Sequence, residues 1–128
     1  MKHLYQSLRT TVSIAFTTIL LCLSFTTSVL SQSFEAETGT RTGGANLQSC
    51  SGCSGGTMVG NLGGPSNGTV VVPVNVSSAG LYTLTIYYCT ADPRVIYVTP
   101  NSGDYTGINC PPSRGWSTVG STSLNITL

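Results

Sequence analysis

The clearest pattern in the chain is the alternating run GLYTLTIYYCT from Gly80 to Thr90. Because successive side chains of a strand point to opposite faces, this run predicts a strand with one face in a core. The predicted core face consists of Tyr82, Leu84, Ile86 and Tyr88, and the outer face consists of Leu81, Thr83, Thr85 and Tyr87.

Other strand signals are shorter and are separated by loops rich in Gly and Ser. They are residues 69–76 (TVVVPVNV), where Pro73 indicates an edge or a bulge, 94–99 (RVIYVT), 116–118 and 123–128. No segment shows the periodicity of a helix. Several short strands without helices predict an all-β fold, specifically a β-sandwich.

The first 31 residues have the features of a secretory signal peptide. A short basic start is followed by a charge-free stretch from Thr10 to Ser33, with Val29 and Ser31 at the −3 and −1 positions of a cleavage site. An uncleaved membrane anchor is the alternative, but Ser and Thr dilute the hydrophobicity of the second half of the stretch. We therefore expect a secreted module of residues 32–128 with no membrane attachment after cleavage.

The charges of the segment 32–128 exclude several functions. It has three Arg, four acidic residues and no Lys or His, for a net charge of −1, so it offers no basic surface to nucleic acid or anionic membrane. Nucleophiles activated by His or Lys are also excluded. The four acids are a pair two residues apart and two loop aspartates, which does not suit a glycosidase pair. We therefore expect no catalysis.

Three sequons, at Asn67, Asn75 and Asn125, agree with a secreted glycoprotein.

Cleavage would remove Cys22 and leave four cysteines, which should pair in an oxidising compartment. These are Cys50, Cys53, Cys89 and Cys110, for which three connectivities exist. A redox role for Cys50 and Cys53 would need a helix behind them, and the following Ser and Gly residues disfavour one. A four-cysteine zinc site would need a second close pair, which Cys89 and Cys110 do not form.

Four stretches, in order, resemble carbohydrate-binding modules of families 6 and 35, especially the family 35 type appended to α-galactosidases and other glycosidases. They are Glu35-Ala36-Glu37, residues 50–60 (CSGCSGGTMVG), residues 80–88 followed by Arg94, and residues 114–119 (RGWSTV). The resemblance implies a jelly-roll β-sandwich, a polysaccharide or glycan ligand, and a linked glycosidase domain in a longer chain. The C-terminal strand of the family is missing from the match.

The resemblance also implies two structural features. A local Cys50–Cys53 disulfide is typical of such modules, which leaves Cys89 and Cys110 to form the second bridge. The family tends to hold a structural calcium with the two Glu of its opening strand, positions that match Glu35 and Glu37 here. A third ligand, an Asp of the closing strand, has no match. The alternative is that Glu35 and Glu37 belong to a solvated acidic edge strand.

Sugar binding requires an aromatic face for the C–H patch of a pyranose ring, together with polar partners for its hydroxyls. Trp116 is the only Trp, follows Gly115, and matches a Trp of the sugar platform in the family. The alternative is that Trp116 packs in the core. Further candidate ligand-binding residues are Arg94, for which bracing of loops is the alternative, and Asn101 and Asp104 in the loop after residues 94–99. Tyr87 and Tyr105 are weaker candidates, for which packing in the core or in a turn is the alternative. We therefore predict non-catalytic carbohydrate binding; the alternative is a secreted structural or cell-surface interaction domain.

Overall fold

The structure is a computed structural model that describes residues 31–128. The chain divides into two units, Met1–Ser33 and Phe34–Leu128, and the second contains all the strands named below. The predicted signal peptide lies almost entirely outside the described residues and stays a prediction. Within residues 31–128, no helix is long and apolar enough to cross a membrane.

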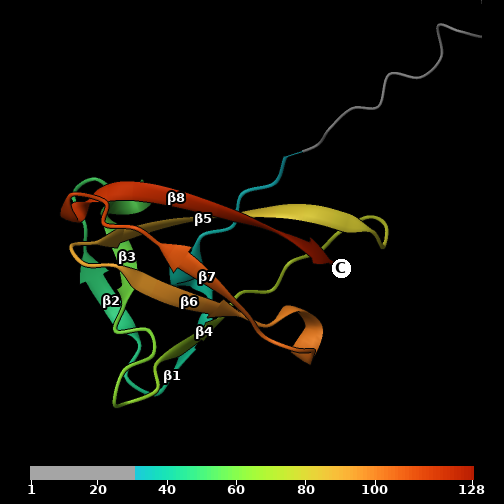
Figure 1. Ribbon diagram of the computed structural model, residues 1–128, viewed down its shortest axis with the longest axis horizontal. Helices are drawn as coiled ribbons and strands as arrows, with labels where there is room; N and C mark the ends of the chain where they lie inside the picture. Colours follow the sequence, from blue (N-terminus) through green and yellow to red (C-terminus); the bar gives the residue numbers. More distant parts are fainter. Residues whose placement is uncertain (1–30) are drawn as a thin grey trace, which may run out of the picture. The chain divides into compact units, whose positions relative to one another are not determined.

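The described unit is built from eight strands and three single turns of 3-10 helix (Figure 1). The strands pair two by two, and all four pairs are antiparallel: β1 with β4, β2 with β3, β5 with β8, and β6 with β7. The all-β fold predicted from the sequence is confirmed. The strands are β1 (Thr40–Thr42), β2 (Asn46–Ser49), β3 (Thr57–Gly60), β4 (Thr69–Val71), β5 (Leu81–Thr90), β6 (Arg94–Val98), β7 (Thr106–Cys110) and β8 (Gly115–Thr127), and the 3-10 turns are η1 (Ala36–Thr38), η2 (Ser54–Gly56) and η3 (Pro100–Ser102).

The longest pair, β5 with β8, follows the alternation read from the sequence. Exposed and half-buried residues alternate along β5, and the half-buried face is the predicted one. On β8 the half-buried face consists of Gly120, Thr122, Leu124 and Ile126. On the outer face, hydroxyl and amide side chains bond across the pair, as in the 3.0 Å bond from Thr83 Oγ1 to Asn125 Oδ1. Residues 116–118 and 123–128 therefore belong to one continuous strand, where the sequence had indicated two.

The most deeply buried residues lie where β5 ends and β8 begins. The register between the two strands shifts between the pairs Tyr88–Gly120 and Thr90–Gly115, which leaves Cys89 without a partner, and the extra residues of the bulge, 116–119, lie opposite it on β8. Ser113 fixes this bend, because its N–H donates to Thr90 O at 2.9 Å and its Oγ accepts from Thr90 N–H at 2.8 Å. The buried residues here are Cys50, Thr90, Cys110 and Ser113.

Two sequence predictions fail in the first half of the module. Residues 69–76 were predicted as one strand, but β4 ends at Val71, shortly before Pro73, which has no N–H to continue the ladder. Glu35 and Glu37 were placed on an opening strand, but Glu35 is the N-cap of η1 and Glu37 lies within it. The two carboxylates therefore do not share a strand face.

Candidate functional site

Four of the five residues predicted to bind ligand lie at or beside the two ends of the β6–β7 hairpin, and the fifth, Tyr87, lies on β5. Figure 1 shows the course of the hairpin. At one end, which we call the junction end, β5 runs into β6 and β7 runs into β8. There Arg94 pairs with Cys110, and Gly115 pairs with Thr90. The other end is the hairpin turn, residues 99–105. Five residues of β6 at about 3.4 Å each separate the two ends, so one small sugar unit cannot contact both.

Trp116 lies at the junction end as the second residue of β8. Arg114 and Gly115 before it both have positive φ, 71° and 128°, a backbone that glycine adopts without strain. This reversal leads the chain out of the Ser113 bend and leaves Trp116 52% exposed. The alternative in which Trp116 fills the core is therefore wrong, and an aromatic surface is available at this end.

Arg94 borders a shallow depression at the same end, with a volume of about 330 Å³. Most of the lining is apolar. The lining residues are Pro93, Arg94, Val95, Asn109, Cys110, Pro111 and Pro112. An apolar depression bordered by residues that carry a guanidinium and an amide suits a hydroxyl-rich ligand. Asn109 was not predicted as a ligand residue; it pairs with Val95 and borders the same depression as Arg94.

Tyr87 occupies the outer face of β5, opposite Ser121 of β8, and its ring is exposed. Two residues, Tyr88 and Cys89, separate it from Thr90, where the junction end begins. Tyr87 therefore offers a second aromatic face on the β5–β8 pair.

The hairpin turn contains the other two predicted residues, Asn101 and Asp104, both exposed. Asn101 belongs to η3 and has a left-handed backbone, with φ 48°. Beside the turn, the rings of Tyr97 and Tyr105 meet edge to face with centroids 5.5 Å apart, and these residues are 66% and 71% exposed.

Tyr97 is an exposed aromatic that the sequence analysis missed. It lies opposite Gly107 in the β6–β7 register, and a Cβ on Gly107 would approach Tyr97 Cε1 to 3.2 Å. The glycine leaves room for the ring to lie close to the partner strand. The alternation of β6 could have placed Tyr97 outward, but the glycine opposite it becomes evident only from the register.

Glu35 and Glu37 do not by themselves make a calcium site. Calcium takes six to eight oxygen ligands, and no third carboxylate of the described residues joins these two in a cluster. The backbone oxygen of Glu37 also accepts a 2.6 Å hydrogen bond from Arg41 Nη1. These two carboxylates alone are too few for calcium, and the calcium prediction stays untested.

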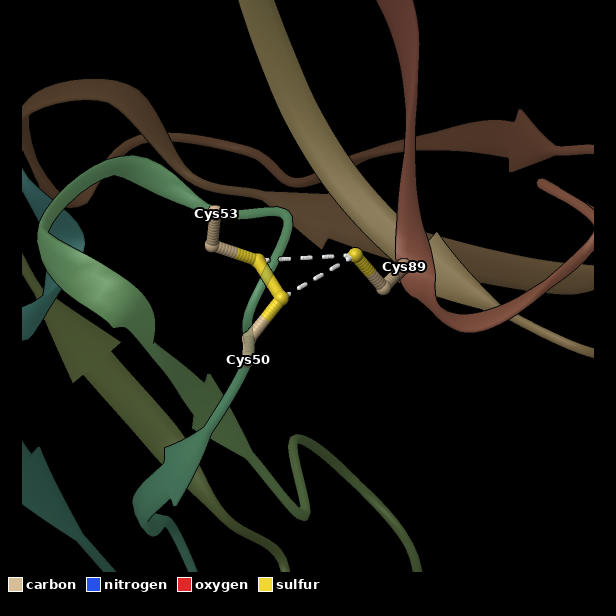
Figure 2. Close-up of side chains that lie close together, drawn as sticks. All are labelled: Cys50, Cys53 and Cys89. Carbon is tan, nitrogen blue, oxygen red and sulfur yellow. Dashed lines mark hydrogen bonds between the residues drawn. A yellow bond between two sulfur atoms is a disulfide. The ribbon is translucent and has the colours of Figure 1, made fainter.

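One of the two predicted disulfides is present. Cys50 and Cys53 are joined, whereas Cys89 and Cys110 are free thiols, so the predicted Cys89–Cys110 bridge is wrong. The reason is the register shift at Cys89, which directs this side chain toward the Cys50–Cys53 bridge (Figure 2). Cys110 is instead buried on β7 opposite Arg94, and burial raises the pKa of its thiol.

Comparison with solved structures adds independent information. A family 35 carbohydrate binding module from Clostridium thermocellum superposes with a TM-score of 0.70 at 29% identity, covering 74% of this chain and 76% of that one. The chain is therefore similar in fold and in sequence to a carbohydrate binding module of family 35. Comparisons with protein-family models and with curated proteins give no match.

The chain is also similar to part of an exo-β-1,3-galactanase from Phanerochaete chrysosporium. The structure of that enzyme with galactose matches at 35% identity and a TM-score of 0.71, and a structure with β-1,3-galactotriose matches at 34% identity and a TM-score of 0.71. Each match covers 79% of this chain and 24% of the galactanase chain. The chain thus spans about a quarter of the length of the galactanase chains that it matches.

Proposed function

We propose that this chain is a family 35 module that binds carbohydrate without catalysis, through the junction end, and that Trp116 provides its aromatic platform. The observation that carries the proposal is the exposure of this single Trp, 52%, at the same end of the hairpin as the depression that Arg94 and Asn109 border. A pyranose can stack its C–H face on the indole, and polar side chains of the junction end can bond to sugar hydroxyls.

The first ligand to test is a β-1,3-linked galactan. The support is the likeness to part of a galactanase chain whose structures contain galactose and β-1,3-galactotriose. A role in retaining an attached or associated glycosidase on its polymer fits a module of this size. Secretion is part of the same proposal, since a disulfide such as Cys50–Cys53 persists in an oxidising compartment.

The absence of catalysis follows from the acids that are available. Glycoside hydrolysis needs two carboxylates facing one another across the substrate, one of them with a raised pKa. Near the proposed surface the described chain offers Asp92, which is exposed. Asp104 lies in the hairpin turn, away from Trp116. The module is therefore proposed to bind the polymer and to leave it intact.

The test is retention on insoluble polysaccharide. We expect the purified chain to be retained on β-1,3-galactan and to release no reducing sugar from it. Trp116→Ala should lose most of the retention while keeping its β-rich circular dichroism, and Val119→Ala, which truncates another exposed apolar residue of β8, is the matched control. Equal retention of a folded Trp116→Ala variant would refute the platform. Failure of the wild-type chain to bind any of a panel of galactans, xylans and mannans would favour an interaction domain without sugar binding.

A further inference from the structure

Three sulfur atoms from two distant segments meet beside the end of β5. Cys50 and Cys53 flank a tight turn before η2, and Cys89 is the residue of β5 that has no partner on β8, opposite the bulge of that strand. Cys89 Sγ lies 3.8 Å from Cys50 Sγ and 3.6 Å from Cys53 Sγ (Figure 2). Cys50 is buried and the other two are half-buried.

These two distances match those between thiolate ligands of one metal ion. In a tetrahedral zinc site the Zn–S bonds are about 2.3 Å long, which places two sulfur atoms about 3.8 Å apart. The spacing of Cys50 and Cys53, with two residues between them, is also a ligand spacing of structural zinc sites. Only the distance between Cys50 and Cys53, which are bonded to each other, has to increase before three thiolates can surround an ion.

We propose that Cys50, Cys53 and Cys89 bind one soft divalent cation such as Zn²⁺ when the Cys50–Cys53 bridge is reduced. A phosphine or dithiol reductant supplies the two electrons, the sulfur–sulfur bond breaks, and two thiols form while the reductant is oxidised. Binding of the cation then displaces one proton from each of the three thiols. Water occupies the fourth position, because Cys110 lies outside the cluster.

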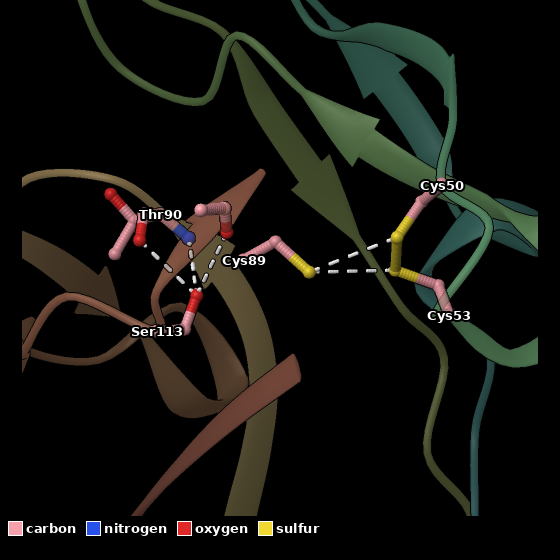
Figure 3. The surroundings of a disulfide bond; sticks show 6 residues. Cys50, Cys53, Cys89, Thr90 and Ser113 are labelled. Atoms are coloured by element: carbon pink, nitrogen blue, oxygen red, sulfur yellow. Dashed lines mark hydrogen bonds between the residues drawn. A yellow bond between two sulfur atoms is a disulfide. The ribbon is translucent and has the colours of Figure 1, made fainter. Parts of the chain in front are cut away.

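The polypeptide around the cluster is held in place by contacts other than the disulfide. Cys53 N–H donates to Cys50 O at 3.1 Å, and Cys50 N–H donates to Gly56 O at 2.9 Å. Gly52 approaches β8 so closely that a Cβ there would collide with Ser117 O. On the other side, the Ser113 hydroxyl fixes Thr90, the neighbour of Cys89 (Figure 3). The turn and Cys89 therefore stay next to each other after reduction, so the site is largely formed before the metal binds.

The test is a titration of the full chain with Co²⁺, in which Cys22 is replaced by Ser in every sample so that only the four described cysteines contribute. In the sample reduced with a phosphine, we expect thiolate-to-cobalt charge-transfer absorption that saturates at one ion per chain and disappears when Zn²⁺ is added. The oxidised sample, which lacks two of the three thiolates, should show none. A reduced chain that keeps its β-rich circular dichroism but shows no such absorption would overturn the proposal.

Two single substitutions separate this cluster from binding by any pair of thiols. Cys89→Ser should lower the charge-transfer intensity by about a third and weaken Co²⁺ binding by roughly tenfold or more, because one of three ligands is lost. Cys110→Ser, the matched control, should leave the charge-transfer intensity unchanged and should change the affinity for Co²⁺ by less than about twofold. Cys53→Ser removes a different ligand from a loop and must also lose binding, which keeps the test valid if Cys89→Ser fails to fold. Unchanged binding in folded Cys89→Ser, or loss in folded Cys110→Ser, contradicts the assignment.

Discussion

The junction end and the hairpin turn both present aromatic rings to solvent, but their supports differ. At the junction end, buried hydrogen bonds between Ser113 and Thr90 fix the chain two residues before Gly115 and Trp116. At the hairpin turn, Tyr97 and Tyr105 contact each other above an exposed loop whose residues 101 and 102 have left-handed backbones. A surface that is already ordered loses less entropy when it binds a ligand. We therefore expect the junction end, whose backbone is held by buried hydrogen bonds, to dominate binding, although it presents fewer exposed aromatic rings than the hairpin turn.

The largest effect should come from removing the support of the junction end. Ser113→Ala deletes the hydroxyl that accepts from the buried Thr90 N–H, so we expect the free energy of unfolding to fall by about 1–3 kcal/mol. Chemical denaturation measures this loss. Ser121→Ala, on the exposed outer face of β8, is the control and should lie within about 0.5 kcal/mol of wild type. If both substitutions lower the free energy of unfolding by the same small amount, the Ser113 hydroxyl stabilises the junction end no more than a surface hydroxyl does.

The next effect separates the two ends as sugar surfaces. Trp116→Ala should weaken galactan binding by roughly tenfold, because aromatic stacking contributes on the order of 1 kcal/mol beyond its buried area. Tyr97→Ala, at the hairpin turn, should weaken binding by about twofold or less if the junction end dominates. Affinity electrophoresis in gels containing soluble galactan compares both variants directly. A larger loss for Tyr97→Ala would move the site to the hairpin turn.

A third effect concerns pH and the buried Cys110. Burial raises the pKa of its thiol above the value of an unfolded cysteine, so the neutral form is favoured in the folded state. Its contribution to stability is therefore complete below the unfolded pKa and is lost as pH rises through the folded pKa. We expect the free energy of unfolding of the wild-type chain to fall at alkaline pH. In Cys110→Ala the plot of this free energy against pH should have a flatter alkaline limb. Identical alkaline limbs in the two proteins would show that another group is responsible.

How much the sequence predicted also differs between elements. Alternation over β5 predicted both of its faces, because that pattern is local and long enough to be unambiguous. Trp116 was identified as a surface aromatic from its glycine neighbour and from the family resemblance. The strands β1, β2, β3 and β7 were missed, since each has at most five residues and little apolar alternation.

The remaining failures have non-local causes. The pairing of Cys89 with Cys110 was what remained after the resemblance implied the Cys50–Cys53 bridge. The position of Cys89 near that bridge depends on the register between β5 and β8. The platform at Tyr97 depends on Gly107, which lies on another strand. Such features need the pairing of strands, which a single sequence does not contain.

The smallest expected effect is that of calcium. Glu35 and Glu37 would need further calcium ligands from groups that the described residues do not supply. If such a site exists, chelation of calcium should lower the melting temperature of the wild-type chain. The Glu35→Gln/Glu37→Gln double variant should then not respond to the chelator. Given only two carboxylates, we expect a shift of a few degrees at most, about 1 kcal/mol or less. A wild-type chain whose melting temperature ignores the chelator would remove calcium from the account.

Trp116 is proposed to form the sugar platform. The fluorescence of Trp116 tests this role most directly, because the chain has a single Trp. Titration with β-1,3-galacto-oligosaccharides should shift and saturate the emission of the wild-type chain, with one Kd that matches the retention experiment. The control ligand is a gluco-oligosaccharide of the same length, for which we expect a much weaker response. Binding shown by calorimetry with no change in Trp116 emission would contradict the account.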